Sequence, residues 1–148
     1  MAEANYSIQN GDNNLTGSAI VSSGDNIKID FISPESLNGI CVESNAGNDV
    51  STLSLSFSGI KSDLPKSTLL NLSLALNLFT KDLAKDLSKL NKDCFQTTDD
   101  MQKCKAIFEK QDFLFEITYN KDTGIPVTMT AKDKDNFCTF EITKFKKI

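Results

Sequence analysis

The chain has 148 residues, a net charge of −4 and a pI near 4.8, which disfavours nucleic-acid binding because phosphate recognition needs clustered positive charge. All 16 basic residues are lysine and histidine is absent, so the commonest general base and metal ligand is missing. Residues 1–148 suffice for one domain, and no run reaches the ~20 apolar residues that a membrane-spanning helix needs.

The sequence from residue 5 to residue 60 predicts short strands joined by tight turns, because clusters of Gly, Asn, Asp and Ser interrupt it. Between these turns, apolar or small residues recur at every second position, as in a half-buried strand. The clearest sets are Tyr6 and Ile8; Leu15, Gly17, Ala19 and Val21; and Ile27, Ile29 and Phe31. Pro34 and Gly39 predict a corner at residues 33–39, since proline lacks a ladder donor and glycine permits a bend.

Leucines dominate the middle of the chain, where we predict one long helix over residues 66–92. Its apolar stripe has helical spacing and consists of Leu69, Leu72, Leu76, Phe79, Leu83, Leu87 and Leu90. Leucines between positions 70 and 78 also alternate as in a strand, but leucine favours helices and the helical stripe is longer. An apolar helix must be buried against a sheet. We therefore predict an α+β fold, in which a curved antiparallel sheet (a half-barrel) is wrapped around one long central helix.

Strands are predicted again over residues 100–146. Phe113, Phe115, Ile117 and Tyr119 alternate with residues of the opposite face. Residues 120–124 predict a hairpin loop in which Gly124 is suited to a positive φ. In the last strand, Cys138, Phe140 and Ile142 share the inner face.

Four cysteines allow three disulfide pairings. Cys94 and Cys104 are the candidate pair, because they bracket a polar segment between the predicted helix and the next strand. The alternative is that all four are free, small, buried residues. Cys138 is expected to be buried, and Cys41 is expected to point to the face opposite its neighbours Ile40 and Val42.

Candidate catalytic and metal-binding groups are few. Acidic pairs occur at residues 99–100 and at residues 133 and 135, in predicted polar turns with no evident base beside them. Without histidine and without a CxxC motif, a zinc site is not expected. We therefore expect no enzyme activity, no metal and no cofactor.

Three fragments occur in a suggestive order: residues 32–40 (ISPESLNGI), residues 57–60 (FSGI) followed by Leu64-Pro65, and residues 119–126 (YNKDTGIP). Together with the leucine-rich segment, they resemble small Gram-positive envelope lipoproteins related to the lipoprotein-localisation carrier (Lol-type) superfamily. The similarity in the order of elements spans roughly residues 5–145. Asn120 stands where that family usually has aspartate, which leaves the turn chemistry intact.

The resemblance implies a half-barrel that binds acyl chains or lipoproteins and has no catalytic residues. It also implies an extracytoplasmic protein, anchored through a lipid on a cysteine that is lost with the removed N-terminal signal. A cytosolic protein is the alternative. The expected partners are a lipid or acyl chain, or an envelope protein, with no nucleic acid and no metal; the protein is expected to be a monomer.

The predicted ligand-binding site is the concave apolar face. Its residues are Phe31, Phe57, Leu69, Leu72, Leu76, Phe79, Phe113, Phe115, Met129 and Phe140. Either these side chains leave a groove that admits an acyl chain, or they fill a solid core. A solid core would favour the second function that we consider, a non-catalytic structural or interaction lipoprotein of the cell envelope without a ligand.

Overall fold

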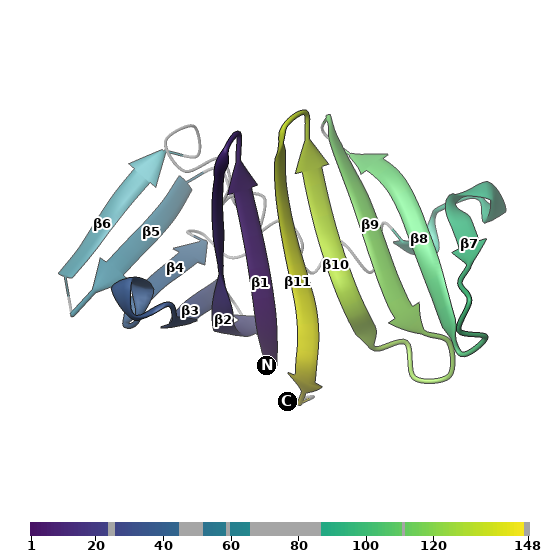
Figure 1. The fold of residues 1–148 in the computed structure, drawn as a ribbon, viewed down its shortest axis with the longest axis horizontal. Helices are drawn as coiled ribbons and strands as arrows, with labels where there is room; N and C mark the ends of the chain where they lie inside the picture. Colours follow the sequence, from purple (N-terminus) through teal and green to yellow (C-terminus); the bar gives the residue numbers. More distant parts are fainter. Residues whose placement is uncertain (24–25, 45–51, 59, 66–86, 111, 147–148) are drawn as a thin grey trace.

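The structure is a computed structural model that describes residues 1–23, 26–44, 52–58, 60–65, 87–110 and 112–146. Its strands form one antiparallel sheet with 11 members, in the order β6-β5-β4-β3-β2-β1-β11-β10-β9-β8-β7 (Figure 1). The antiparallel sheet that the sequence predicted is therefore confirmed.

Consecutive hairpins build the first half of the sheet, and each strand pairs with the one that precedes it. The strands are β1 (Ala2–Asn10), β2 (Asn13–Ser23), β3 (Ile27–Ser33), β4 (Ile40–Ser44), β5 (Thr52–Phe57) and β6 (Ile60–Pro65). A 3-10 helix, η1 (Glu35–Leu37), lies between β3 and β4, where Gly39 has a φ of +84°. The predicted corner at residues 33–39 is thus confirmed.

The second half is also a run of hairpins. After the 3-10 helix η3 (Lys92–Cys94) come β7 (Phe95–Thr97), β8 (Lys103–Lys110), β9 (Phe113–Asn120), β10 (Pro126–Asp133) and β11 (Asn136–Phe145). The last strand, β11, pairs with the first strand, β1, along its length, with Tyr6 opposite Phe140 and Ile8 opposite Cys138. This seam joins the two halves into a continuous sheet and places the two chain ends next to each other (Figure 1).

The loop between β9 and β10 shows how local chemistry fixes a hairpin. The Asn120 side-chain oxygen accepts hydrogen bonds from the backbone N–H groups of Asp122 (3.0 Å) and Thr123 (2.9 Å). Gly124 has a φ of +67°, and its N–H donates to the Asn120 carbonyl at 2.8 Å. The predicted loop at residues 120–124 is confirmed, and an asparagine oxygen serves there as an aspartate oxygen would.

The predicted fold class is wrong, because the described chain is nearly all antiparallel sheet and is not a sheet wrapped around a long central helix. Of the predicted helix, residues 66–86 lie outside the described residues. In the remainder, only Leu87 and Ser88 are helical; a turn follows, and Asn91 is extended (φ −67°, ψ 156°) ahead of η3. Leu87 and Leu90 both pack against the sheet. They lie on the same side of the chain, as their spacing of three residues predicts, although no continuous helix joins them.

None of the helices among the described residues has the length and apolar content required to cross a membrane.

Candidate ligand-binding face

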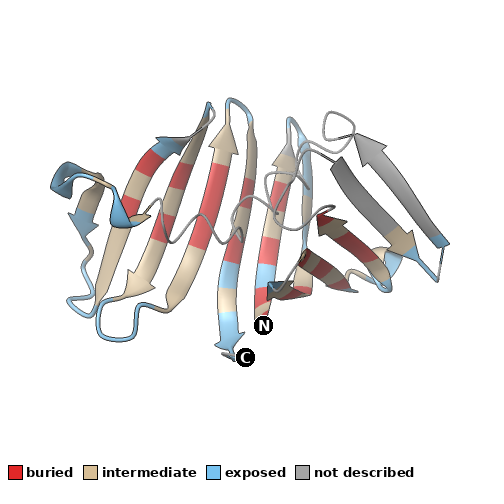
Figure 2. Cartoon of the chain, turned by 180° about the vertical axis from the view of Figure 1, so that it is seen from behind, coloured by how far each residue is buried: buried red, intermediate tan, exposed pale blue. Residues whose placement is uncertain are grey.

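The two faces of the sheet differ in chemistry because side chains alternate along each strand. We call the apolar one the inner face. Buried positions recur at every second residue of β3 and β9, for example, and they line up across neighbouring strands (Figure 2). The largest fully buried side chains of this face are Phe140, Ile27, Ile29, Ile117, Val42 and Cys138. The face is therefore one continuous apolar surface that spans both halves of the sheet.

Aromatic rings form two groups on the inner face. Near the seam, the Tyr6 ring meets the Phe31 ring edge-on, with centroids 5.2 Å apart, and lies 6.1 Å from the Phe140 ring. On the other side of the seam, the Phe108 and Phe115 rings stack with centroids 5.3 Å apart. Such offset and edge-on pairs stabilise the face beyond the burial of their area.

The structure places most of the described predicted site residues together. Phe31, Phe115, Met129 and Phe140 are buried in the apolar cluster, and Phe113 is partly buried against it. These residues come from β3, β9, β10 and β11, which the sequence assigned to the inner face on alternation alone. The inward positions of Ile27 and Ile29 are confirmed as well.

Phe57 differs from the expectation, because 53% of its side chain is exposed. It is the last residue of β5 and pairs with Ile60 across the β5–β6 turn, so it lies at the margin of the sheet and not within the cluster. The other predicted site residues lie outside the described residues; they are Leu69, Leu72, Leu76 and Phe79.

A contact at Gly17 is part of the inner face that the sequence did not reveal. Tyr6 and Gly17 are opposite each other in β1 and β2, and the Tyr6 hydroxyl donates a 2.6 Å hydrogen bond to the Ser33 carbonyl of β3. The ring thus passes over a strand position that has no side chain. Burial raises the pKa of Tyr6, which keeps this hydroxyl in its donor form. A glycine inside an alternating strand was the available signal, since it often marks a close approach.

The opposite face, which we call the outer face, is polar and carries a cross-strand ion network. Glu116 of β9 lies between Lys132 of β10 (2.9 Å) and Lys105 of β8 (3.2 Å). Lys132 and Lys105 hold the pKa of Glu116 below its usual range, with Lys132 as the larger cause. Thr130 and Thr139 are hydrogen-bonded at 3.0 Å on the neighbouring strands. These are contacts of a solvated sheet face, and each of these five side chains has a structural partner.

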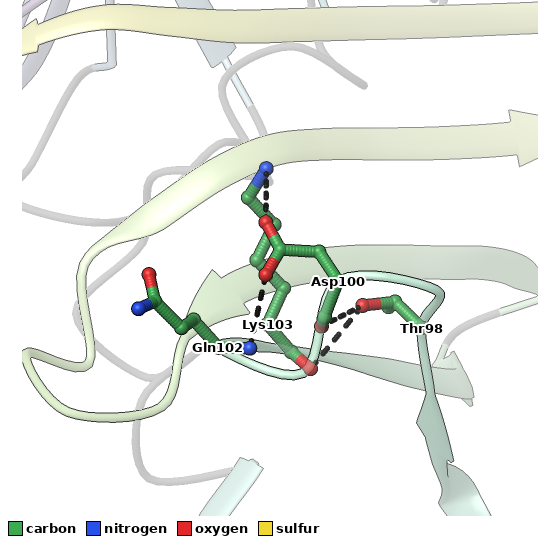
Figure 3. A network of polar contacts seen from close by, with 4 residues as sticks. All are labelled: Thr98, Asp100, Gln102 and Lys103. Atoms are coloured by element: carbon green, nitrogen blue, oxygen red, sulfur yellow. Dashed lines mark hydrogen bonds and ion pairs between the residues drawn. The ribbon is translucent and has the colours of Figure 1, made fainter.

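The acidic pair at residues 99–100 is also structural. The backbone N–H of Gln102 donates to Asp100 at 3.0 Å, and Lys103 lies 3.1 Å from the same carboxylate (Figure 3). These two contacts lower the pKa of Asp100, the Gln102 N–H contributing most. Thr98 closes the turn with a 2.7 Å bond to the Asp100 carbonyl. In the described part of the chain, no three His, Cys, Asp or Glu side chains gather as a metal site.

All four cysteines are thiols in this structure. Cys41 and Cys138 are buried, the latter as predicted; burial raises the pKa of Cys138, and it raises that of Cys41 to about 11. Cys104 pairs with Thr97, three residues beyond Cys94, so the strand register separates the candidate pair by roughly 10 Å. A disulfide spans less than about 7 Å between Cα atoms. A Cys94–Cys104 bridge therefore requires a different register between β7 and β8. The bridge stays a prediction, which a count of the free thiols would test.

No protein-family model and no curated protein sequence matches the chain. Among solved structures, a similar one is an uncharacterised conserved protein from Thermus thermophilus, with a TM-score of 0.51 and 12% identity over 99% of this chain and 77% of that chain. This chain shares its fold. Another is a candidate outer membrane lipoprotein-sorting protein domain from Vibrio parahaemolyticus, with a TM-score of 0.46 and 10% identity over 97% of this chain and 82% of that chain. At such identities the likeness concerns the fold alone.

Proposed function

We propose that this protein is a non-catalytic binding module that holds an apolar ligand, an acyl chain or a lipid, against the inner face of its sheet. The observation that supports this proposal most is the continuity of the apolar face across the seam, from β3 and β4 to β8 and β9. Apolar area of this breadth favours contact with other apolar groups over contact with water. Among the described residues outside the strands, Leu37 of η1, Leu87 and Leu90 pack against this face.

The composition of the inner face suits a flexible hydrocarbon. Phenylalanine rings provide large apolar surfaces, and Met129 lies among them with an adaptable thioether side chain. Phe113, at the start of β9, is only partly buried. We expect an acyl chain to contact the margin of the apolar cluster at this residue. Among the described residues, no Asp, Glu or Lys side chain contributes to the buried cluster, so the ligand is expected to present no charge to it.

Lipid extraction tests the proposal directly. Protein purified from its native source is extracted with organic solvent and analysed by mass spectrometry, and delipidated protein is titrated with a fluorescent fatty acid. We expect a stoichiometric lipid in the extract and saturable uptake of the probe. Repeated extracts without lipid, together with no probe uptake, would refute the proposal.

Two adjacent residues of β9 give a matched pair of variants. Phe113 faces the inner side, whereas Leu114 faces the outer side opposite Lys132, and both are partly buried. We expect Phe113→Asn to weaken probe binding by roughly tenfold, the effect of losing part of one aromatic contact. Leu114→Asn should leave binding unchanged. Equal effects of the two variants would indicate loss of folding and not loss of a binding surface.

An interaction protein without a ligand is the second candidate, and the β5–β6 turn supports it. The side chains of Phe57 and Ile60, which are register partners, are 53% and 75% exposed. Exposed apolar neighbours are typical of protein contact sites. The test is cross-linking in the cells that produce the protein, followed by identification of the bound partner. Loss of that partner in an Ile60→Ser variant, with no lipid in the purified protein, would favour this function.

The proposal also includes an extracytoplasmic location with a lipid anchor, and a monomeric protein; the resemblance read from the sequence supports the location. Mass spectrometry of the N-terminal peptide from native cells tests for an acylated cysteine, and light scattering tests the monomer. An unmodified N-terminal peptide in a cytosolic fraction would contradict the location without affecting the fold.

A further inference from the structure

The β1–β2 turn and the β10–β11 turn stand side by side at one end of the sheet (Figure 1). Residues of these two turns and of the adjoining strands line a hollow of about 580 Å³. Its position belongs to the outer face, because Phe137 alternates with the inward-facing Cys138. Phe137 pairs with Gln9 of β1 on one side and with Lys132 of β10 on the other. An aromatic ring is thus flanked by two long polar side chains. The hollow is within the range of small-molecule sites, roughly 300–1,000 Å³.

The polar groups around the ring come from both turns. The β1–β2 turn contributes Asp12, and the β10–β11 turn contributes Lys134, Asp135 and Asn136. Within the described chain, none of these four side chains has a hydrogen-bond or ion-pair partner. They contrast with Lys132, whose ammonium group already lies 2.9 Å from Glu116. The hollow therefore brings together unpaired acceptors, an unpaired donor and an amide that provides both.

The side chain of Gln9 is fixed beside the hollow by a hydrogen bond. Its side-chain N–H donates a 2.9 Å hydrogen bond to the carbonyl of Gly11. Gly11 has a φ of +55°, and a Cβ added there would meet nothing within 4 Å, so the turn leaves this side of the hollow open. The amide oxygen of Gln9 remains as an acceptor next to the Phe137 ring.

We propose that this hollow, formed by Gln9, Asp12, Lys134, Asp135, Asn136 and Phe137, is a binding site for a neutral sugar residue. The C–H side of a pyranose ring carries slight positive charge and packs on the negative face of an aromatic ring. Its hydroxyl groups each donate and accept hydrogen bonds. Carboxylates accept these bonds, the ammonium group donates, and the amides do both. The site is independent of the inner face.

Charge decides against anionic ligands that stack on an aromatic ring. A nucleotide or another anion would approach the carboxylates of Asp12 and Asp135, while Glu116 already neutralises Lys132. The unpaired ammonium group of Lys134 provides a donor but does not outweigh the two carboxylates. A neutral polyhydroxylated ligand satisfies both signs of charge without repulsion.

The test uses the whole chain labelled with ¹⁵N and two soluble probes of similar size. They are chitotetraose, which is neutral, and tetragalacturonate, which is anionic. We expect chitotetraose to shift the backbone amide signals of Gly11 and Phe137, with a Kd of about 1 mM or tighter. The anionic probe should bind at least tenfold more weakly.

Variants distinguish binding from folding. Phe137→Ala should weaken chitotetraose binding by roughly tenfold, whereas Leu114→Ala, on the same face two strands away, should not change it. Should Phe137→Ala fail to fold, Asp12→Asn combined with Asp135→Asn replaces exposed groups only and should still weaken binding. The proposal is overturned if chitotetraose does not bind at about 10 mM, if the anionic probe binds as tightly, or if the shifts occur elsewhere on the sheet.

Discussion

Replacing Gly17 by alanine should destabilise the protein strongly, although alanine is usually better than glycine in a strand. The backbone at Gly17 lies outside the left-handed region, so conformation alone would let Gly17→Ala stabilise the fold by about 0.5–1 kcal/mol. The added Cβ, however, would lie 2.0 Å from the Ser33 carbonyl oxygen and 2.7 Å from the Tyr6 hydroxyl. The clash with the Ser33 backbone therefore makes Gly17→Ala destabilising instead of stabilising.

The magnitude follows from what must move. An ordinary Cβ contact begins at 3.4 Å, so β2 and β3 must separate by more than 1 Å at this point. Overpacking of this kind costs about 1–3 kcal/mol, and each hydrogen bond lost with it about 1 kcal/mol. The bonds at risk join Ser33 to Tyr6 (2.6 Å) and to Ser18 (2.8 Å). We therefore expect Gly17→Ala to lower the free energy of unfolding by about 3 kcal/mol.

Urea unfolding followed by circular dichroism measures this change, and calorimetry should show a melting temperature lower by about 10 °C. Gly11→Ala is the control, because it places alanine at a φ of +55° in open space and should lose only about 1–2 kcal/mol. A stability of Gly17→Ala equal to or above that of the native protein would refute the close approach of β3 to β2.

Three further predictions concern single polar groups. Tyr6→Phe should lower the free energy of unfolding by about 1–3 kcal/mol in urea titrations, because the Ser33 carbonyl loses its donor; no change would mean that water replaces the hydroxyl. Glu116→Gln should cost under about 1 kcal/mol at pH 7, because its two lysine partners are partly exposed. The Glu116 pKa is lowered by folding, so this stabilisation is present above the unfolded pKa of about 4.3 and is lost as pH falls through the lowered folded value. Urea midpoints of the two proteins should therefore converge in acid, and a constant difference would contradict the ion network. In reduced native protein, Cys41 and Cys138 should react with a thiol reagent far more slowly than the two partly exposed cysteines; mass spectrometry after partial labelling would reveal the opposite order.

The alternation of apolar residues predicted which face of the sheet a side chain occupies better than it predicted how far that side chain is buried. Ile27, Ile29 and Phe31 are all buried as expected, because a strand in the interior of the sheet buries its whole apolar face. Phe57 has the same alternation and is half exposed, because it ends β5 beside a turn. Depth depends on where each strand lies in the sheet, and strand order is a tertiary property that a local pattern does not contain.

Other features depended on partners that are distant in the chain. A glycine inside β2 signals a close approach, but nothing local identifies Ser33 as the group that comes close. Part of the leucine stripe fits two periods at once, and its helical spacing up to Leu90 favoured a helix to residue 92, whereas the chain after Ser88 is not α-helical. The outer-face hollow had one usable signal, namely an aromatic residue at position 137 out of phase with the inward positions of β11.

The pairing of β1 with β11 has a consequence for how the chain reaches this fold. Every other pair in the sheet joins strands that are neighbours in sequence, so each half can assemble as a meander by local steps. The seam alone needs segments that are distant in sequence, such as Tyr6 and Phe140, which are 134 residues apart. During synthesis, the backbone groups of β1 that bond to β11 therefore remain unpaired until β11 is made. This open strand edge is able to pair with strands of other chains. The strand that covers this edge is β11, which follows the other ten strands of the sheet in the sequence.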